Sequence, residues 1–431
     1  MRRKLSAIEH MIDGNIVYIV TLEGHFSEEQ LRSSIQRVQR KHPALRMVMI
    51  EKGGKLYYEE ECEAEIPLRI IPYLRDHDLE RERQAELMTP FPYGQPQLRV
   101  VWLQSNTDNH LLFTSSHRIC DGMSMLTIVR ETLRLLSSRE EMVPYPAVTA
   151  QDLIGDYTPA HPWKEKLKAH LLNLLLQMIP ASNHQALNNE YYLEWSLDSP
   201  QTEALKLRCR AEGTSIHAAL FVALDRALLA VLGRKKLPAW IESPMDVRRG
   251  RMSRLKSDML FFGGGSLKLH TGEHAQQDFW TRARVVHDEI RRQIEKEMID
   301  IPKRYYFNEL LRPVTRERIQ TMVRVGDMLK VNGSWNRFAL SNLGSIDLQN
   351  EASPFRLKDL RLYVHSFNFR LLGLVAYTLQ GKLRFYYAGD LECLDRSQAE
   401  VLKAMFSEIL TKQIHHESDR TPGIALSAAV V

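Results

Sequence analysis

A predicted strand, turn and helix between residues 110 and 125 constrain the fold of this chain more than any other stretch. The apolar run Leu111–Phe113 leads into small polar residues, which predicts that residues 110–116 form a buried strand. Apolar residues recur at helical spacing from Met123 to Leu136, which predicts a helix directly after the turn. The turn between two such elements is therefore well suited to present functional side chains.

The turn carries His117, with Asp121 four residues later and Gly122 next to it. An imidazole is largely neutral near pH 7, so His117 can take a proton from a hydroxyl or amine that becomes a nucleophile. Gly122 allows the chain or a substrate to approach closely, and Asp121 either orients the histidine or anchors the turn through a distant arginine. The alternative is a core histidine, a helix N-cap and a turn glycine. These residues alone leave both interpretations open.

The composition is that of a globular protein with more than one domain. A length of 431 residues suits two domains, and 44% hydrophobic with 26% charged residues allows a sizeable core. The net charge of +5 is spread along the chain without a lysine and arginine block, so we expect no nucleic-acid partner. Either an anionic small partner or an ordinary solvated surface accounts for this charge.

The cysteines and the N-terminus indicate a cytoplasmic protein. Four scattered cysteines with neither CxxC spacing nor a histidine cluster indicate no disulfide framework and no metal site. Cys120 has no evident base of its own, so we do not expect it to be a nucleophile. The basic N-terminus lacks the apolar core of a signal peptide, and no apolar stretch approaches the ~20 residues that span a bilayer. We expect a soluble monomer.

A proline-rich, aperiodic stretch over residues 144–162 predicts a bridge between two halves. A helix is predicted to follow over residues 163–179, with a markedly apolar second half. Three roles remain open for this helix: packing in the core or between domains, a lid over a substrate channel, and contact with a membrane surface.

The turn His117–Gly122 resembles the HxxxDG motif of the chloramphenicol-acetyltransferase-like superfamily. That group includes condensation domains of nonribosomal peptide synthetases, polyketide-associated acyltransferases and alcohol acetyltransferases. Further phrases resemble the family in the expected order: "rHPaLR" at Lys41–Arg46, "vDvR" at Asp246–Arg248 and "SNLG" at Ser341–Gly344. Within the first phrase, His42 reads as a structural residue at a helix C-terminus. The resemblance covers nearly the whole chain.

The resemblance implies an α/β (α+β) fold of two chloramphenicol-acetyltransferase-like subdomains, each a mixed sheet with flanking helices. Residues 1–180 would form the subdomain that carries HxxxDG, and residues 181–431 would form the other. The active site would lie in a tunnel between them, with an acyl thioester entering from one face and an acceptor from the other.

The resemblance also implies a role for each residue of the site. His117 would be the general base, and Arg248 would pair with Asp121, which then shapes the turn. A planar guanidinium holds a carboxylate by two directional hydrogen bonds, although Arg248 as a loop-surface charge remains the alternative. Ser341 and Asn342 offer donors to an oxyanion or to pantetheine amides, unless they form only an ordinary strand-to-turn transition.

The reaction that this implies is acyl transfer to a hydroxyl, with no metal and no cofactor beyond acyl-coenzyme A or a phosphopantetheinyl carrier protein as co-substrate. Peptide-forming condensation domains usually read HHxxxDG, and Ser116 stands at the first histidine position. This departure favours ester formation and makes Ser116 a candidate substrate contact. Two alternatives remain: a stand-alone condensation enzyme that joins the acyl group to an amine, and a non-catalytic module that binds carrier proteins.

Residues 259–269 resemble the family strand that follows the arginine phrase. Their three consecutive glycines, Gly263–Gly265, are not a phosphate-binding loop, because no Gly-Lys-Ser/Thr follows at the required spacing. A bulge or a close crossing of two backbone segments explains these glycines better.

Overall fold

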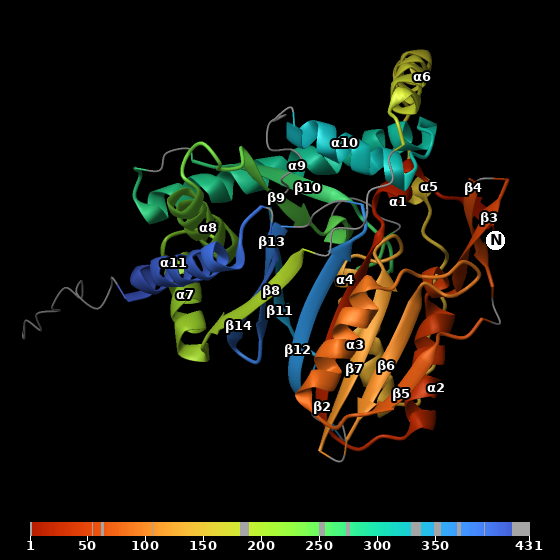
Figure 1. Cartoon of the computed structure of the whole chain (residues 1–431), viewed down its shortest axis with the longest axis horizontal. Coiled ribbons are helices and arrows are strands. Elements are labelled where there is room, and N and C mark those ends of the chain that lie inside the picture. Colours follow the sequence, from red (N-terminus) through yellow and green to blue (C-terminus); the bar gives the residue numbers. More distant parts are fainter. Residues whose placement is uncertain are drawn as a thin grey trace, which may run out of the picture.

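The computed structural model describes residues 2–53, 55–61, 64–105, 107–181, 189–249, 255–272, 276–328, 338–348, 355–368, 372–391 and 393–415. These residues form two large mixed sheets flanked by helices, with a small three-stranded sheet beside them (Figure 1). The predicted α/β fold with two mixed sheets is therefore confirmed. The predicted boundary at residue 180 adjoins residues outside the described part, so the division into 1–180 and 181–431 stays a prediction.

The first large sheet has five strands and carries the HxxxDG turn at the end of its central strand. Its strands, in spatial order, are β12 (Phe355–Ser366), β2 (Gly14–Gly24), β7 (Asp108–Ser116), β6 (Leu98–Gln104) and β5 (Leu68–Pro72). Side chains alternate between the two faces of β2, so Tyr18 and Val20 face one apolar core and Val17 and Ile19 face another. The central strands are therefore buried on both faces.

Strand β12 comes from the C-terminal part of the chain but belongs to this first sheet (Figure 1). It pairs antiparallel with β2 along its full length, from Phe355 opposite Gly24 to Ser366 opposite Gly14. The sequence analysis did not predict this strand. Its position means that the N-terminal sheet is completed only when the C-terminal part of the chain has folded against it.

The second large sheet has six strands. In spatial order they are β10 (Gly265–His270), β9 (Trp240–Met245), β11 (Phe338–Ile346), β13 (Leu372–Leu379), β14 (Lys382–Asp390) and β8 (Glu190–Leu197). A hairpin turn at Gln380 and Gly381 joins β13 to β14, and both residues have positive φ angles, 50° and 78°. The predicted strand over residues 259–269 is wrong in its first half, because only Gly265–His270 pairs with β9.

Helices cover both sheets, and a small sheet of β1 (Arg2–Lys4), β4 (Lys55–Glu60) and β3 (Met47–Lys52) lies at the side. α2 begins with a capping box, in which Gln30 N donates to Ser27 Oγ at 3.1 Å. α2 and α4 pack on one face of the first sheet and α3 covers the other. The helices are α1 (Ala7–Met11), α2 (Glu28–Lys41), α3 (Asp76–Met88), α4 (Gly122–Leu136), α5 (Ala150–Ile154), α6 (Pro162–Met178), α7 (Ser199–Ala211), α8 (Ile216–Leu232), α9 (Phe279–Leu310), α10 (Arg316–Met328) and α11 (Arg396–His415), with short 3-10 turns η1 (Pro43–Arg46) and η2 (Val247–Arg249).

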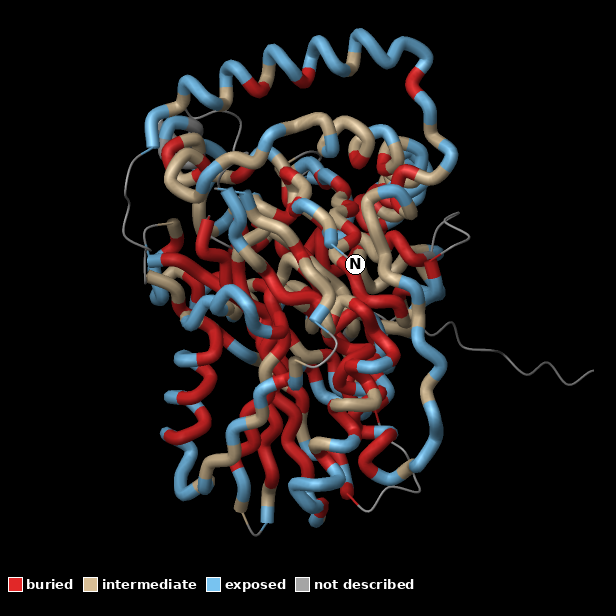
Figure 2. The backbone as a smooth tube through the Cα atoms, turned by 90° about the vertical axis from the view of Figure 1, so that its right-hand side faces the viewer, coloured by how far each residue is buried: buried red, intermediate tan, exposed pale blue. Residues whose placement is uncertain are grey.

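The predicted helix over residues 163–179 is present as α6, which projects from one end of the molecule. Figure 2 shows that most of this helix is exposed, so it does not pack in a core. No single helix among the described residues is long and apolar enough to cross a membrane, and the bent pair α7 and α8 reaches that length and composition only when taken together.

A buried ionic cluster joins the end of α2 to the middle of α4. Lys41 and His42 both contact the carboxylate of Glu131, and the His42 Nε2 to Glu131 Oε2 distance is 2.7 Å. The exposed fractions of the Lys41, His42 and Glu131 side chains are 8%, 1% and 8%. Lys41 also reaches Asp258 at 2.6 Å. His42 lies at the end of α2, as predicted, and it is held there by its contact with Glu131 of α4 rather than by the helix dipole alone.

Replacing Glu131 by alanine should lower the free energy of unfolding by about 3 kcal/mol, because His42 would be left buried without its acceptor and Lys41 would keep only Asp258. Urea denaturation followed by circular dichroism measures this change. Glu140→Ala is the control: Glu140 pairs with Arg134 where both side chains are 44% or more exposed, so it should cost at most about 1 kcal/mol. Equal effects of the two substitutions would contradict the buried cluster.

Candidate active site

His117 lies in the turn that links the end of β7 to the start of α4, as the sequence predicted. Its backbone N–H donates to Gly14 O at 2.9 Å, and its ring Nδ1 lies 2.8 Å from the carbonyl oxygen of Cys120. A carbonyl oxygen can only accept, so Nδ1 carries the proton and donates it to Cys120 O. In the neutral ring, the lone pair is therefore on Nε2.

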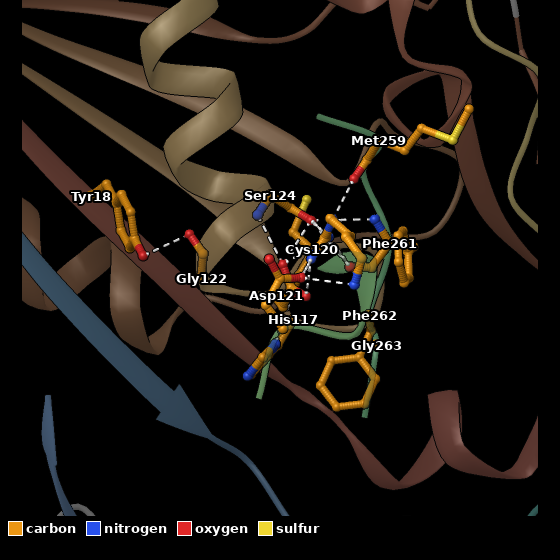
Figure 3. A network of polar contacts seen from close by, with 12 residues as sticks. Tyr18, His117, Cys120, Asp121, Gly122, Ser124, Met259, Phe261, Phe262 and Gly263 are labelled. Carbon is orange, nitrogen blue, oxygen red and sulfur yellow. Dashed lines mark hydrogen bonds and ion pairs between the residues drawn. The ribbon is translucent and has the colours of Figure 1, made fainter. Parts of the chain in front are cut away.

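The surroundings of His117 keep its ring neutral. Burial lowers the pKa of His117 below its ordinary value of 6.5, outweighing the opposing effects of the Cys120 carbonyl and the Asp121 charge. The edge of the Phe262 ring contacts the imidazole, with ring centroids 5.3 Å apart. Figure 3 shows the His117 ring pointing away from the polar network around Asp121. The ring is thus held in one tautomer and one direction.

Asp121 and Arg248 form a two-pronged ion pair between the two large sheets. Arg248 Nη1 donates to Asp121 Oδ2 at 2.8 Å, and Nη2 donates to Oδ1 at 3.0 Å. Asp121 is also the N-cap of α4, because its Oδ1 accepts the backbone N–H of Ser124 at 2.8 Å. Burial alone would raise the pKa of Asp121, but the charge and hydrogen bonds of Arg248, with the bonds from Ser124, hold it below its usual value.

The guanidinium of Arg248 is fully enclosed, with 0% of its side chain exposed. Its Nε donates to Met259 O at 3.0 Å, its Nη2 donates to Phe261 O at 3.1 Å, and the Phe261 ring lies 4.2 Å below it. Residues 259–264 are predicted as strand, but the carbonyl groups of Met259 and Phe261 bind this cation instead, and Tyr305 OH donates to Phe262 O at 3.1 Å. These carbonyl groups are therefore not available to a neighbouring strand.

The three glycines allow this segment to approach the arginine phrase. A Cβ atom on Gly263 or Gly265 would lie 2.7 Å from a methyl group of Val247, and Gly264 has a positive φ of 59°. The structure therefore agrees with the predicted close crossing of two backbone segments.

The turn is also held from the side of β2. Tyr18 OH donates to Gly122 O at 2.9 Å (Figure 3). A Cβ atom on Gly122 would lie 3.2 Å from this hydroxyl and 3.4 Å from Leu343 Cδ2, which leaves little room for a side chain. Sequence reasoning identified Gly122 but missed Tyr18, because a tyrosine within an apolar strand gives no sign of its distant partner.

A cavity of about 1470 Å³ lies between the two sheets and opens onto the turn. Typical pockets for single ligands measure roughly 300–1,000 Å³, so this one has room for two substrates. Of the predicted site residues, the cavity is lined by His117, Asp121, Gly122, Ser341 and Asn342. Asn342 Oδ1 accepts the Gly344 N–H at 2.9 Å, so the side-chain NH₂ is the group that Asn342 can offer to a substrate.

Ser116 does not match its prediction as a substrate contact. It is the last residue of β7, only 2% exposed, and is not among the residues that line the cavity. Strand alternation explains this difference, because Ser116 pairs with Asn15 inside the first sheet, while His117 follows where the strand has ended.

A second histidine, which sequence reasoning missed, also faces the cavity. His217 Nε2 lies 2.7 Å from Ser243 Oγ, and both residues line the cavity wall. Burial lowers the pKa of His217 to about 4. The two residues come from α8 and β9, 26 positions apart, without any recognisable motif. This pair supplies an uncharged polar contact on the side of the second sheet.

The remaining candidates for covalent or metal chemistry are weak. Cys120 is fully buried, and burial raises the pKa of its thiol to about 12, so it carries no thiolate near neutral pH. Within the described residues, no group of three or more histidine, cysteine or acidic side chains is arranged to hold a metal ion. Among the described residues, His117 is therefore the candidate that the proposed function uses.

Replacing Asp121 by alanine should lower the free energy of unfolding by about 3–5 kcal/mol, because Arg248 would stay buried without its counter-charge. Asp121→Asn keeps the helix cap and should cost less. Asp198→Ala is the matched control: Asp198 caps α7 through Gln201 N at 2.8 Å, and its loss should cost about 1 kcal/mol.

Denaturation curves of these three variants separate the cap from the ion pair. The pKa of Asp121 is lowered in the folded protein. The stability that the Asp121–Arg248 ion pair contributes is therefore present above pH 3.8 and is lost as the pH falls below that value. Similar losses for Asp121→Ala and Asp198→Ala would show that the ion pair contributes nothing.

Comparison with protein-family models matches residues 14–256 to the condensation domain, which is more than half of the chain. The chain is 28% identical over 145 residues to surfactin synthase subunit 1 of Bacillus subtilis (strain 168), covering 31% of this chain and 4% of that protein. It is 27% identical over 178 residues to gramicidin S synthase 2 of Aneurinibacillus migulanus, covering 39% and 4%. The chain thus spans about 4% of the length of these relatives.

Two solved structures show the same fold over almost the whole chain. Polyketide synthase associated protein 5 from Mycobacterium tuberculosis has a TM-score of 0.65 at 14% identity, over 95% of this chain and 98% of that one. The first condensation domain of the calcium-dependent antibiotic synthetase has a TM-score of 0.67 at 13% identity, over 96% of each chain. Because the family match includes the HxxxDG turn and the arginine phrase that pins it, this chain belongs to the condensation-domain family of acyltransferases.

Proposed function

We propose that this chain transfers an acyl group from a thioester of coenzyme A or a carrier protein to a hydroxyl acceptor, with His117 as the general base. The observation that carries the proposal is the hydrogen bond from His117 Nδ1 to Cys120 O, which leaves an unprotonated Nε2 on a ring that lines the cavity. A base needs a free lone pair directed at its substrate, and this arrangement supplies one.

In the proposed reaction, Nε2 accepts the proton of the acceptor hydroxyl while the oxygen attacks the thioester carbonyl. The resulting oxyanion is stabilised by donors in the cavity, for which the Ser341 hydroxyl and the Asn342 amide are the candidates. The tetrahedral intermediate then collapses, the C–S bond breaks, and the protonated His117 returns its proton to the leaving thiolate. No covalent acyl-enzyme is required, because holding both substrates in one cavity already removes much of the barrier.

Support for an ester product comes from the residue before His117. The family relatives that form peptide bonds usually carry a second histidine there, and this chain has Ser116, which is buried in the sheet. His117 is therefore the single imidazole that this turn presents. With an amine acceptor the same step would give an amide, so the acceptor decides the product.

Replacing His117 by alanine should reduce turnover by about 10²–10⁴-fold, since the proton acceptor is lost. The test incubates purified protein with acyl-coenzyme A or an acyl carrier protein, together with an alcohol or an amine, and identifies products by mass. Wild type should form ester. His25→Ala, at an exposed histidine, is the control and should keep full activity.

Three outcomes would contradict the proposal in different ways. Amide as the only product would make this a stand-alone condensation enzyme. Full turnover by His117→Ala would remove the general base from the mechanism. Tight binding of a carrier protein with no product from any donor would indicate a non-catalytic binding module.

The pH dependence of kcat/KM should follow the ring of His117. Burial lowers the pKa of His117 below 6.5. The ring therefore stays unprotonated, and kcat/KM stays constant, as the pH falls to 6.5. At lower pH the ring becomes protonated, and the rate should fall about tenfold per pH unit. Circular dichroism over the same range distinguishes titration from unfolding, and an acidic limb centred above pH 6.5 would argue against a buried neutral histidine.

A further inference from the structure

Helix α6 presents a stripe of large apolar side chains to solvent, and we call this set the α6 stripe. Its members recur every three or four positions, so they share one side of the helix. They are Trp163 (63% exposed), Leu167 (51%), Leu171 (53%), Leu174 (47%), Leu175 (61%) and Met178 (79%). A helix of a globular protein normally turns such a stripe toward the core.

The opposite side of α6 fixes the helix to the body. Asn173 Nδ2 donates to Leu310 O at 3.2 Å, and Arg312 N donates to Asn173 Oδ1 at 2.7 Å. Asn173 and Ala169 are the buried residues of the helix. Positions two apart differ by about 200° around a helix axis, so anchoring Asn173 directs Leu171 away from the protein. The outward stripe is therefore set by specific hydrogen bonds.

Lysines lie on both sides of the α6 stripe. Lys164 and Lys168 lie along one edge and Lys166 along the other, as follows from 3.6 residues per turn. The single acidic residue of α6, Glu165, is on the docked side and pairs with Lys168 at 3.0 Å. An apolar stripe between cationic edges complements a surface that is apolar inside and anionic at its boundary.

The α6 stripe lies near the entrance of the cavity. The residues that Asn173 holds are at the end of α9, where Asn308 and Leu311 line the cavity. Ile299 of the same helix lines the cavity and is 71% exposed. Figures 1 and 2 show α6 beyond α9 at one end of the molecule. Because the α6 stripe faces away from α9, a surface that met it would be separated from these residues by the width of α6, roughly 10 Å.

We propose that α6 is an interfacial helix that docks this protein on an anionic lipid surface. The α6 stripe enters the boundary between headgroups and acyl chains, and the three lysines contact the anionic headgroups. The inference concerns docking only and does not depend on which acceptor or acyl donor the enzyme uses.

The experiment measures sedimentation of the full chain with vesicles of equimolar phosphatidylcholine and phosphatidylglycerol, and with vesicles of phosphatidylcholine alone. Wild type should bind the anionic vesicles at least tenfold more tightly, and about 1 M salt should weaken this binding because it screens charges beyond ~3 Å. Lys164→Gln, Lys166→Gln and Lys168→Gln combined should remove the preference for anionic lipid.

The α6 stripe itself is tested by Leu171→Glu with Leu174→Glu, which should weaken binding at least tenfold. Leu207→Glu on α7 and Val401→Glu on α11 are matched controls, because these residues are 54% and 52% exposed elsewhere; both should bind like wild type. Thermal melts should be unchanged for all of these variants, since each replaced side chain is about half exposed.

Three results would overturn the proposal. The first is wild-type protein that binds neither kind of vesicle, and the second is an α6 double variant that binds as well as wild type. The third is light scattering that shows a dimer which Leu171→Glu with Leu174→Glu converts to a monomer. In that case the α6 stripe is an interface between two copies of the chain.

Discussion

The ion pair between Asp121 and Arg248 is the interaction on which the site depends. Asp121 follows the central strand of one sheet and Arg248 follows a strand of the other, 127 positions later. Because the guanidinium is completely enclosed, removing either partner leaves a buried charge, and the two strand ends therefore have to stay together. The pair positions the turn rather than taking part in proton transfer, since both carboxylate oxygens are occupied by Arg248 and Ser124.

Three of the described histidines line the same cavity, and His365 is one of them, with its Nδ1 2.7 Å from Glu190 Oε2. The hydrogen bonds of the other two, His117 and His217, differ. His117 uses Nδ1 on a backbone carbonyl, which fixes its tautomer and leaves Nε2 for a substrate. His217 uses Nε2 on the Ser243 hydroxyl, a group that can either donate or accept, so its tautomer is not fixed by this contact. A pKa of about 4 also makes His217 a poor proton acceptor near neutral pH. The turn geometry therefore favours His117 over His217 as the proposed base.

Features encoded in short stretches were predictable from sequence. The capping box at Ser27, the hairpin at Gln380 and the strand, turn and helix around His117 depend on neighbouring residues, and all three are present. The contact of Arg248 with Asp121 was predictable only through resemblance, because no local rule connects positions so far apart. The error at residues 259–264 has a physical cause: the carbonyl groups of Met259 and Phe261 bind the arginine instead of a neighbouring strand.

What sequence reasoning missed are long-range arrangements, and these shape the cavity. β12 reaches back to pair with β2, where Arg356 contacts Glu23 from 333 positions away, and local propensity cannot choose such a partner. Residues 362–366 of β12 line the cavity, so this pairing sets part of its wall. The HxxxDG turn is thus a short motif that can be read directly from the sequence, whereas the shape of the cavity beside it depends on strand order. Two chains with the same HxxxDG turn can therefore differ in the cavity onto which it opens.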